Sequence, residues 1–175
     1  MTIHAVSALP DNSLLIAYRD ARAYTDGFSL DLPMAVTLVG YIEAFYTTPL
    51  FKLERLILAA LVAKPSTDAD ALALALNTRT RFAAWTVEAR TDDQILMCDF
   101  MKKTRSWLMC AALPNGGTRL YFGSAIVPEH ISADGRVSLG LSFHLLLGFH
   151  QLYSRALLAS AAQRLTRRPS RPAGR

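Results

Sequence analysis

The stretch from Arg81 to Val127 constrains this chain most, because it reads as four antiparallel strands joined by tight turns. Asn115-Gly116 is the clearest turn signal, since both residues tolerate the positive φ that a type I′ hairpin turn requires. Two polar pairs, Asp92-Asp93 and Lys102-Lys103, mark the other breaks between apolar runs. Three turns in a row predict an antiparallel meander.

Two-residue turns at all three breaks sort the meander side chains onto two faces. The resulting pairs are Val87 with Cys98, Cys98 with Trp107, and Met109 with Phe122. The predicted apolar face carries Trp85, Val87, Ala89, Leu96, Cys98, Phe100, Trp107, Met109, Ala111, Leu113, Leu120, Phe122 and Ile126. The other face is polar apart from Ile95, Met97, Leu108 and Tyr121. We therefore expect one face to meet helices and the other to meet water.

The flanking segments predict one further strand and several helices. Residues 28–32 alternate apolar and polar, which predicts a fifth strand after a turn at Asp26-Gly27. Helices are expected at 34–46, at 49–63 after a Thr48 cap, from the Thr67–Asp70 capping box to Leu76, and at 139–165. The apolar face of the last helix includes Phe143, Leu146, Leu147, His150, Tyr153, Leu157 and Ala161. Loop is expected at 129–136.

Length and charge indicate one folded domain with a basic tail. The 175 residues predict a single domain over 1–166, including a weakly patterned segment at 1–26, and a disordered tail at 167–175. The formal net charge of +5 equals the five arginines among the last twelve residues, so the body is nearly neutral and is not expected to bind nucleic acid. Neither a signal peptide nor a transmembrane segment is visible, so a cytoplasmic protein is expected.

The predicted order is strand, two or three helices, four-stranded meander and long helix. It indicates an α+β fold in which a curved antiparallel sheet grips the C-terminal helix. Over about Phe28 to Ala162 this order resembles the helix-grip superfamily (START and Bet v 1-like, SRPBCC), and more closely an uncharacterised bacterial group of small helix-grip domains. The residues that carry the closer resemblance are Phe28-Ser29-Leu30-Asp31-Leu32-Pro33, Phe45, Pro49, Phe149-His150, Arg155 and Leu157-Leu158. That group has Pro-Phe-His where this chain has Gly148-Phe149-His150. The resemblance implies a fold with a cavity, and no particular reaction.

His150 is the candidate for chemistry, because it is a polar side chain within the apolar face of the last helix. It would serve as a general base or ligand hydrogen-bonder, or else as a core histidine satisfied by a neighbouring hydroxyl. The predicted cavity lining is Trp85, Phe100, Trp107, Met109, Phe122, Phe143, Leu147 and His150. Asp99 and Glu43 are expected to face solvent, and the four histidines lack metal-site spacing, so neither metal nor cofactor is expected.

Three functions of different classes fit this reading. The first is a module that binds an apolar small molecule or lipid between the sheet and the last helix. The second is an enzyme of the polyketide-cyclase or aromatase kind, which the superfamily also contains, with His150 as its acid or base. The third is a non-catalytic interaction protein, homodimeric for example, that associates through the apolar part of the outer sheet face: Ile95, Met97, Leu108 and Tyr121.

Overall fold

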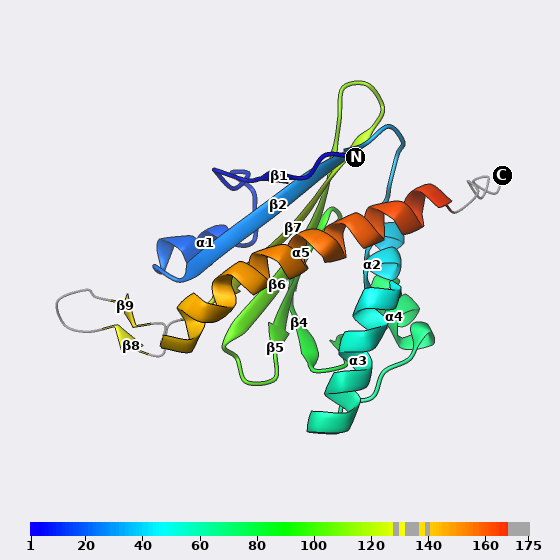
Figure 1. Cartoon of the computed structure of the whole chain (residues 1–175). Helices are drawn as coiled ribbons and strands as arrows, with labels where there is room; N and C mark the ends of the chain where they lie inside the picture. The colour runs from blue at the N-terminus through cyan, green and yellow to red at the C-terminus, as the bar shows by residue number, and fades with distance from the viewer. Residues whose placement is uncertain (128–129, 132–136, 139–140, 168–175) are drawn as a thin grey trace.

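One seven-stranded antiparallel sheet organises the fold (Figure 1). In spatial order its strands are β1 (His4–Ala5), β2 (Tyr24–Leu32), β7 (Thr118–Ile126), β6 (Thr104–Ala112), β5 (Gln94–Asp99), β4 (Trp85–Arg90) and β3 (Arg81–Phe82). The expected strand at 28–32 does join the meander, through β2 and β7. It begins earlier, however, at Tyr24, so the turn expected at Asp26-Gly27 is wrong.

The computed structural model describes residues 1–127, 130–131, 137–138 and 141–167. Within these ranges, the side chains of 58–59, 61–62, 130–131, 137–138 and 141–147 are not described. Most of the loop expected at 129–136 and all but the first residue of the tail expected at 167–175 lie outside the described residues. The described part of the loop is β8 (His130–Ile131), which pairs with β9 (Val137–Ser138) just after the loop.

The helices follow the predicted start and stop signals closely. They are α1 (Ile16–Asp20), α2 (Leu38–Tyr46), α3 (Pro49–Val62), α4 (Asp68–Ala75) and α5 (Leu141–Arg167). The Thr67–Asp70 capping box is confirmed, and the Thr48 hydroxyl accepts the Phe51 N–H at 3.1 Å. The start of α2 lies later than expected, because the Thr37 side chain caps it. Within the described part of the chain, no helix combines the length and apolar character needed to cross a bilayer.

The loop between β6 and β7 differs from the expected turn by one residue. Leu113 N–H donates to Gly117 O (2.9 Å) and Gly116 N–H donates to Leu113 O (3.0 Å), so three residues form the loop. Gly116 has a φ of +79°, but Asn115 lacks the positive φ that a type I′ turn demands. Pro114 instead suits the first central position of a type I turn, which a left-handed glycine then follows. This longer loop shifts the β6–β7 register by one residue.

The one-residue shift separates side chains that were expected to share a face. Phe122 pairs with Leu108 instead of Met109, and Trp107 pairs with Gly123. Because directly paired residues point to the same side of a sheet, Trp107 and Phe122 lie on opposite faces. The prediction that they share one buried face is therefore wrong. Gly123 makes room for the indole, since a Cβ there would lie 3.0 Å from Trp107 Cε3.

A β-bulge in β4 exchanges faces a second time. Ala89 lies opposite Leu96, as the predicted β4–β5 turn requires, but the register shifts between Val87 and Ala89. Val87 consequently pairs with Met97, one residue away from its expected partner. A bulge inserts one unpaired residue, so every side chain beyond it changes face. Trp85 and Val87 thus pack on the side of Met97 rather than with Leu96.

The β5–β6 connection is longer than expected without changing any face. Four residues, Phe100–Lys103, connect the strands instead of two, so the register moves by two residues. Leu96 pairs with Trp107, and Cys98 pairs with Arg105. A two-residue shift preserves the alternation of side chains, which is why the grouping of Leu96, Cys98 and Trp107 is confirmed.

The sheet buries apolar side chains on both faces. On the helix side the buried apolar strand residues are Phe28, Leu30, Leu32, Phe82, Ile95, Met97, Leu108, Cys110, Leu120 and Phe122. A second cluster comprises Leu15, Leu96, Trp107, Met109 and Ala125. The three residues Ile95, Met97 and Leu108 were expected on a wet outer face but are fully buried, so they present no surface to a partner. Cys98 and Cys110 do lie on opposite faces, as expected.

The N-terminal segment covers the second face, which was expected to be wet. Leu15 is fully buried in the cluster around Trp107. Gln94, also buried, accepts Trp107 Nε1–H (2.9 Å) and Leu14 N–H (3.0 Å) with one oxygen. Its amide nitrogen donates to Asn12 O at 2.9 Å. Within the weakly patterned segment 1–26, Leu9, Leu14, Leu15 and Tyr18 therefore contribute apolar cover to the second face.

Helices α2 and α5 cover the first face, and Figure 1 shows α5 lying across the sheet. Leu157 and its neighbour Leu158 are buried in the core beside Phe122 and Phe45. The predicted apolar face of the last helix thus holds at Leu157. Among the described residues, α5 contacts β2, β7, α2 and α3, and a space remains between these elements.

Candidate ligand-binding cavity

A cavity of about 550 Å³ lies between the sheet, α3 and α5. This volume falls within the range of small-molecule sites. Most of its wall is apolar, and the aromatic members are Phe45, Phe51, Trp85, Phe122, Phe149 and Tyr153. Polar side chains interrupt this wall at few points, among them Glu54, Ser106, Ser124, His150 and Ser154.

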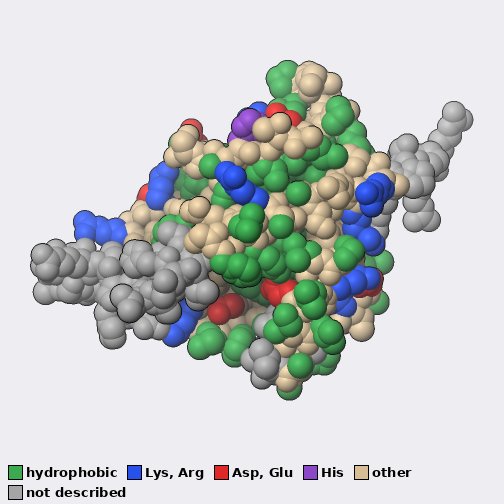
Figure 2. All heavy atoms as spheres, in the orientation of Figure 1, with side chains coloured by type: hydrophobic (Ala, Val, Ile, Leu, Met, Phe, Trp, Pro, Cys, Tyr) green, Lys and Arg blue, Asp and Glu red, His purple; other side chains and the backbone are tan. Residues whose placement is uncertain are grey.

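The cavity opens to solvent between α3 and α5. Leu53 and Ile57 line it from α3 and Phe149 lines it from α5, yet these side chains are 55%, 48% and 66% exposed. Figure 2 shows hydrophobic side chains gathered over both helices. The apolar stripe predicted on α3 is thus only partly covered. An apolar molecule would first contact these solvent-exposed apolar side chains at the opening and then the more buried side chains of the interior.

His150 joins two other polar side chains at the cavity wall. Its Nε2 lies 2.8 Å from Ser124 Oγ and 3.3 Å from Asp26 Oδ2. Ser124 Oγ donates to Asp26 Oδ1 at 2.6 Å, and Ser124 N–H approaches the same oxygen at 3.2 Å. Three separate elements, β2, β7 and α5, therefore bring these groups together.

These contacts decide the chemistry open to the cluster. Because Ser124 gives its proton to Asp26, its oxygen accepts from His150, and we assign the imidazole proton to Nε2. A nucleophilic serine would instead give its proton to the histidine, so this is not the arrangement of a hydrolase triad. The assignment leaves Nδ1 with the lone pair, as a general base requires.

A second polar group lies on the other side of the cavity. Tyr153 on α5 donates to Glu54 Oε2 on α3 at 2.5 Å. Burial raises the pKa of the Glu54 carboxyl, and the hydrogen bond from Tyr153 opposes that rise. Burial beside this carboxylate also raises the pKa of Tyr153, so the phenol keeps its proton. The pair connects α3 with α5.

Trp85 adds an unsatisfied donor to the cavity wall. Its Nε1–H is buried and has no hydrogen-bond partner among the described residues. Most buried polar groups in folded proteins are paired, so an exception beside a cavity requires an explanation. A bound molecule with an acceptor atom would provide one.

Only some of the residues predicted to line the cavity do so, because the register shift at β6–β7 and the bulge in β4 move side chains to the opposite face of the sheet. Trp85, Phe122 and His150 line the cavity. Trp107 and Met109 pack in the cluster under the N-terminal segment, so their predicted place in the cavity is wrong. Phe100 belongs to the β5–β6 connection and is 50% exposed. Two further predicted lining residues, Phe143 and Leu147, have side chains outside the described residues.

Neither acid considered from the sequence lines the cavity. Asp99 Oδ1 accepts the N–H groups of Lys103 (2.7 Å) and Thr104 (3.0 Å), which stabilises the β5–β6 connection. Glu43 is partly exposed on α2. No cluster of three metal-ligating side chains occurs among the residues that the structure describes.

Sequence reasoning missed four polar groups of this cavity in different ways. The sequence predicts a turn at Asp26, and no pattern distinguishes Ser124 from the other residues of its strand. Glu54 had a readable signal, because it lies in the helical stripe formed by Leu50, Leu53 and Ile57. The helical period places Tyr153 on the correct helix face but does not indicate a partner for it.

Comparison of the chain with protein-family models, curated proteins and solved structures gives no match.

Proposed function

We propose that this protein binds a small, largely apolar molecule in the cavity between the sheet and α5. The cavity itself carries the proposal: it has a volume of about 550 Å³ and a wall that is apolar except at a few points. Protein interiors are close-packed, and voids larger than a water molecule are few. A space of this size therefore lacks contacts that a ligand would supply.

The wall also contains groups that would orient a ligand. Ser124, His150 and Glu54 each present polar atoms to an otherwise apolar space, and Trp85 holds an unpaired donor. Few, fixed polar groups within an apolar wall are typical of specific small-molecule sites. The buried donor and the buried carboxyl would each gain a partner on binding.

Native mass spectrometry of protein purified from cells tests the proposal directly, because a retained ligand adds a defined mass. In parallel, 1-anilinonaphthalene-8-sulfonate reports an open apolar cavity by its fluorescence. Ser154→Phe on α5 should fill the cavity and abolish the retained mass and the fluorescence. Ala156→Phe places the same ring at an exposed position on the same helix and should change neither.

Thermal unfolding distinguishes a filled cavity from a damaged fold. Ser154→Phe should retain a cooperative transition near that of Ala156→Phe. Binding of the dye equal in the two variants, together with a ligand-free mass spectrum for the unmodified chain, would contradict the proposal.

We also propose membership of the helix-grip superfamily. The α+β order, the antiparallel sheet and the C-terminal helix across it support this assignment. A cavity between sheet and helix is what the resemblance implies. An experimental structure compared with solved helix-grip domains would test it, and a different strand order would contradict it.

A second candidate function is proton transfer, as in a polyketide-cyclase or aromatase type of enzyme. The contact of His150 with Ser124 and Asp26 favours it, because the neutral ring then keeps a lone pair at Nδ1. A base in an apolar cavity should remove the C–H proton of 5-nitrobenzisoxazole, while the N–O bond breaks to give a cyanophenolate. His150→Ala should abolish this reaction, and Gln151→Ala, an exposed neighbour, should not. Equal rates would remove the candidate.

A further inference from the structure

Glu54 occupies an unusual position for a carboxylate. It lies on α3 among Leu50, Leu53 and Ile57, and all four side chains line the cavity. A charged group on the apolar side of a helix is costly unless it has a partner. The phenol of Tyr153 supplies one neutral hydrogen bond at 2.5 Å.

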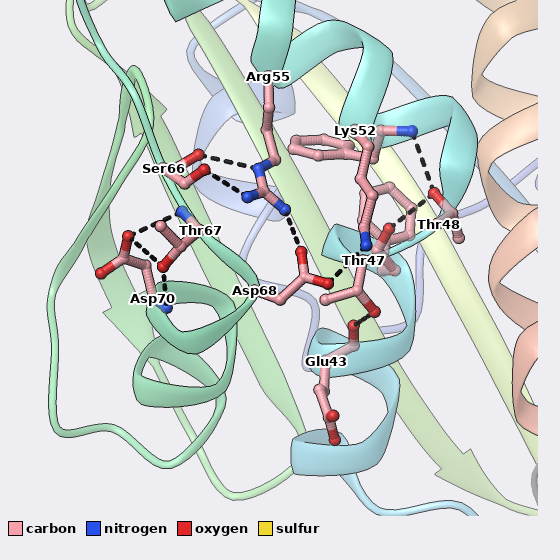
Figure 3. Close-up of polar contacts among 11 residues, drawn as sticks. Glu43, Thr47, Thr48, Lys52, Arg55, Ser66, Thr67, Asp68 and Asp70 are labelled. Carbon is pink, nitrogen blue, oxygen red and sulfur yellow. Dashed lines mark hydrogen bonds and ion pairs between the residues drawn. The ribbon is translucent and has the colours of Figure 1, made fainter.

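The cations nearest to Glu54 in the sequence turn away from it. Lys52 and Arg55 both reach Asp68, at 2.5 Å and 2.7 Å. Arg55 also donates to Ser66, through Nε at 3.0 Å. Figure 3 shows both basic side chains directed to the start of α4 and to Ser66 just before it. No ion pair of Glu54 is found among the residues that the structure describes.

The remaining charges at the cavity are already matched. Arg105 lines it but pairs with Glu88 at 2.9 Å, and its guanidinium lies 4.9 Å from the ring of Tyr18. Nε2 of His150 lies 3.3 Å from Oδ2 of Asp26, so these two groups face each other. The unbalanced charge of the described cavity wall is therefore the negative one, at Glu54.

Aromatic rings line the same cavity as this carboxylate, and one of them, Tyr153, contacts it. Phe149 and Tyr153 stack with ring centroids 6.0 Å apart, and Phe51 and Trp85 line the same cavity. Aromatic faces attract cations, and desolvation strengthens that attraction. A cavity that combines one carboxylate with several aromatic rings is a chemical environment that suits an ammonium group.

We infer that the ligand of this cavity is an amphiphilic amine, whose ammonium group binds Glu54 and whose apolar body occupies the aromatic interior. This inference rests on the proposed binding function and specifies its ligand class. The ammonium donates to the carboxylate and contacts the rings, while Tyr153 keeps its hydrogen bond to Glu54. A carboxylic acid of the same shape would face repulsion at the same point.

The pH dependence follows from the state that binds. Only the ionised Glu54 attracts an ammonium, and burial raises the pKa of this carboxyl in the free protein. Amine affinity should therefore be highest above that pKa and should fall as the pH drops through it. Affinity for an uncharged ligand of the same chain length should not follow this trend.

Three probes with one alkyl chain separate the head group from the apolar body: dodecylamine, dodecanol and dodecanoate. Isothermal titration calorimetry at neutral pH, below the concentrations at which the probes aggregate, should show dodecylamine binding about tenfold more tightly than dodecanol. Dodecanoate should bind more weakly than either.

Glu54→Gln removes the charge with little change of shape and should abolish the preference for dodecylamine over dodecanol. Tyr153→Phe keeps both the carboxylate and the ring, so it should retain that preference. Glu43→Gln removes a carboxylate from α2, away from the cavity, and should behave like the unmodified chain. Far-ultraviolet circular dichroism verifies that each variant is folded.

The outcomes are distinct. Failure of all three probes to bind would overturn the proposed binding function. Binding of dodecanol or dodecanoate as tightly as dodecylamine would leave that function standing and overturn the amine inference. An amine preference that persists in Glu54→Gln would also overturn it.

Discussion

The two tryptophans lie on opposite faces of one sheet and differ in almost every respect. Trp107 is fully buried, and its Nε1–H donates to Gln94 at 2.9 Å. Trp85 is partly exposed, lines the cavity, and has a buried Nε1–H that lacks a partner in the described structure. One face is closed around its indole, whereas the other leaves its indole beside an open space.

This difference indicates a division of roles between the two faces. The N-terminal face satisfies its buried polar atoms internally through Gln94, Leu14 and Asn12. The helix face retains an unpaired donor, a buried carboxyl and a cavity. We interpret the first as a stabilising layer and propose that the second is the layer that meets a ligand.

The largest expected effect is that of Trp107→Ala. Loss of a fully buried aromatic side chain typically costs about 3–5 kcal/mol of the free energy of unfolding. Trp85→Ala should cost clearly less, because that side chain is already partly exposed and adjoins empty space. Urea unfolding of both variants measures the difference. Equal losses would show that the two faces contribute alike, contrary to the comparison.

Leu157→Ala tests how far the cavity face still holds α5. Leu157 is buried, so the substitution should cost about 2–5 kcal/mol. Arg155 is exposed, with its guanidinium 5.2 Å from the ring centroid of Phe28, so Arg155→Ala should cost at most about 1 kcal/mol. Thermal and urea unfolding compare them. A larger loss for Arg155→Ala would mean that another face of α5 is docked.

Gln94→Met removes the hydrogen bonds of the closed face while keeping a similar shape. It leaves Trp107 Nε1–H and Leu14 N–H without partners, each of which typically costs about 1–3 kcal/mol when buried. Hydrogen exchange at the Leu14 amide should accelerate as the N-terminal segment loosens. Gln151→Met, at an exposed site on α5, serves as the control and should leave exchange at Leu14 unchanged.

The order of the five long strands was predictable from the sequence, but the two-residue edge strands β1 and β3 and the faces of the sheet were not. Polar and Gly-containing breaks mark the strands, so the meander and its fifth strand follow directly. A face, however, depends on whether each loop shifts the register by an odd or even number of residues. The three-residue loop that contains Pro114 and the bulge between Val87 and Ala89 each shift the register by one residue. The β5–β6 connection shifts the register by two residues, so it leaves every side chain on its predicted face.

A signal for two covered faces was present in the strands themselves. The runs 95–98 and 107–112 are apolar without alternation, which is typical of strands buried on both sides. What covers the second face could not be predicted, because residues 1–26 lack a clear period. The cluster of His150 with Asp26 and Ser124 needs three elements far apart in the chain, so only the folded structure brings it together.

The smallest expected effect concerns the acid of the cavity face. Because burial raises the pKa of Glu54, the folded state holds this proton more tightly than the unfolded state does. The contribution of the protonated Glu54 carboxyl to stability is therefore complete below the pKa that this group has in the unfolded state. It is lost as the pH rises through the higher pKa that the group has in the folded state. Glu54→Gln cannot titrate, so its stability relative to the unmodified chain should increase from pH 4 upward and become constant once Glu54 is ionised. The hydrogen bond from Tyr153 lowers the pKa of Glu54, so Tyr153→Phe should move this rise to higher pH. Urea unfolding across that range measures both shifts. If the difference in the free energy of unfolding between Glu54→Gln and the unmodified chain stays constant or falls with pH, Glu54 is solvated. The cavity face would then hold no desolvated acid, in which respect it would resemble the face around Trp107.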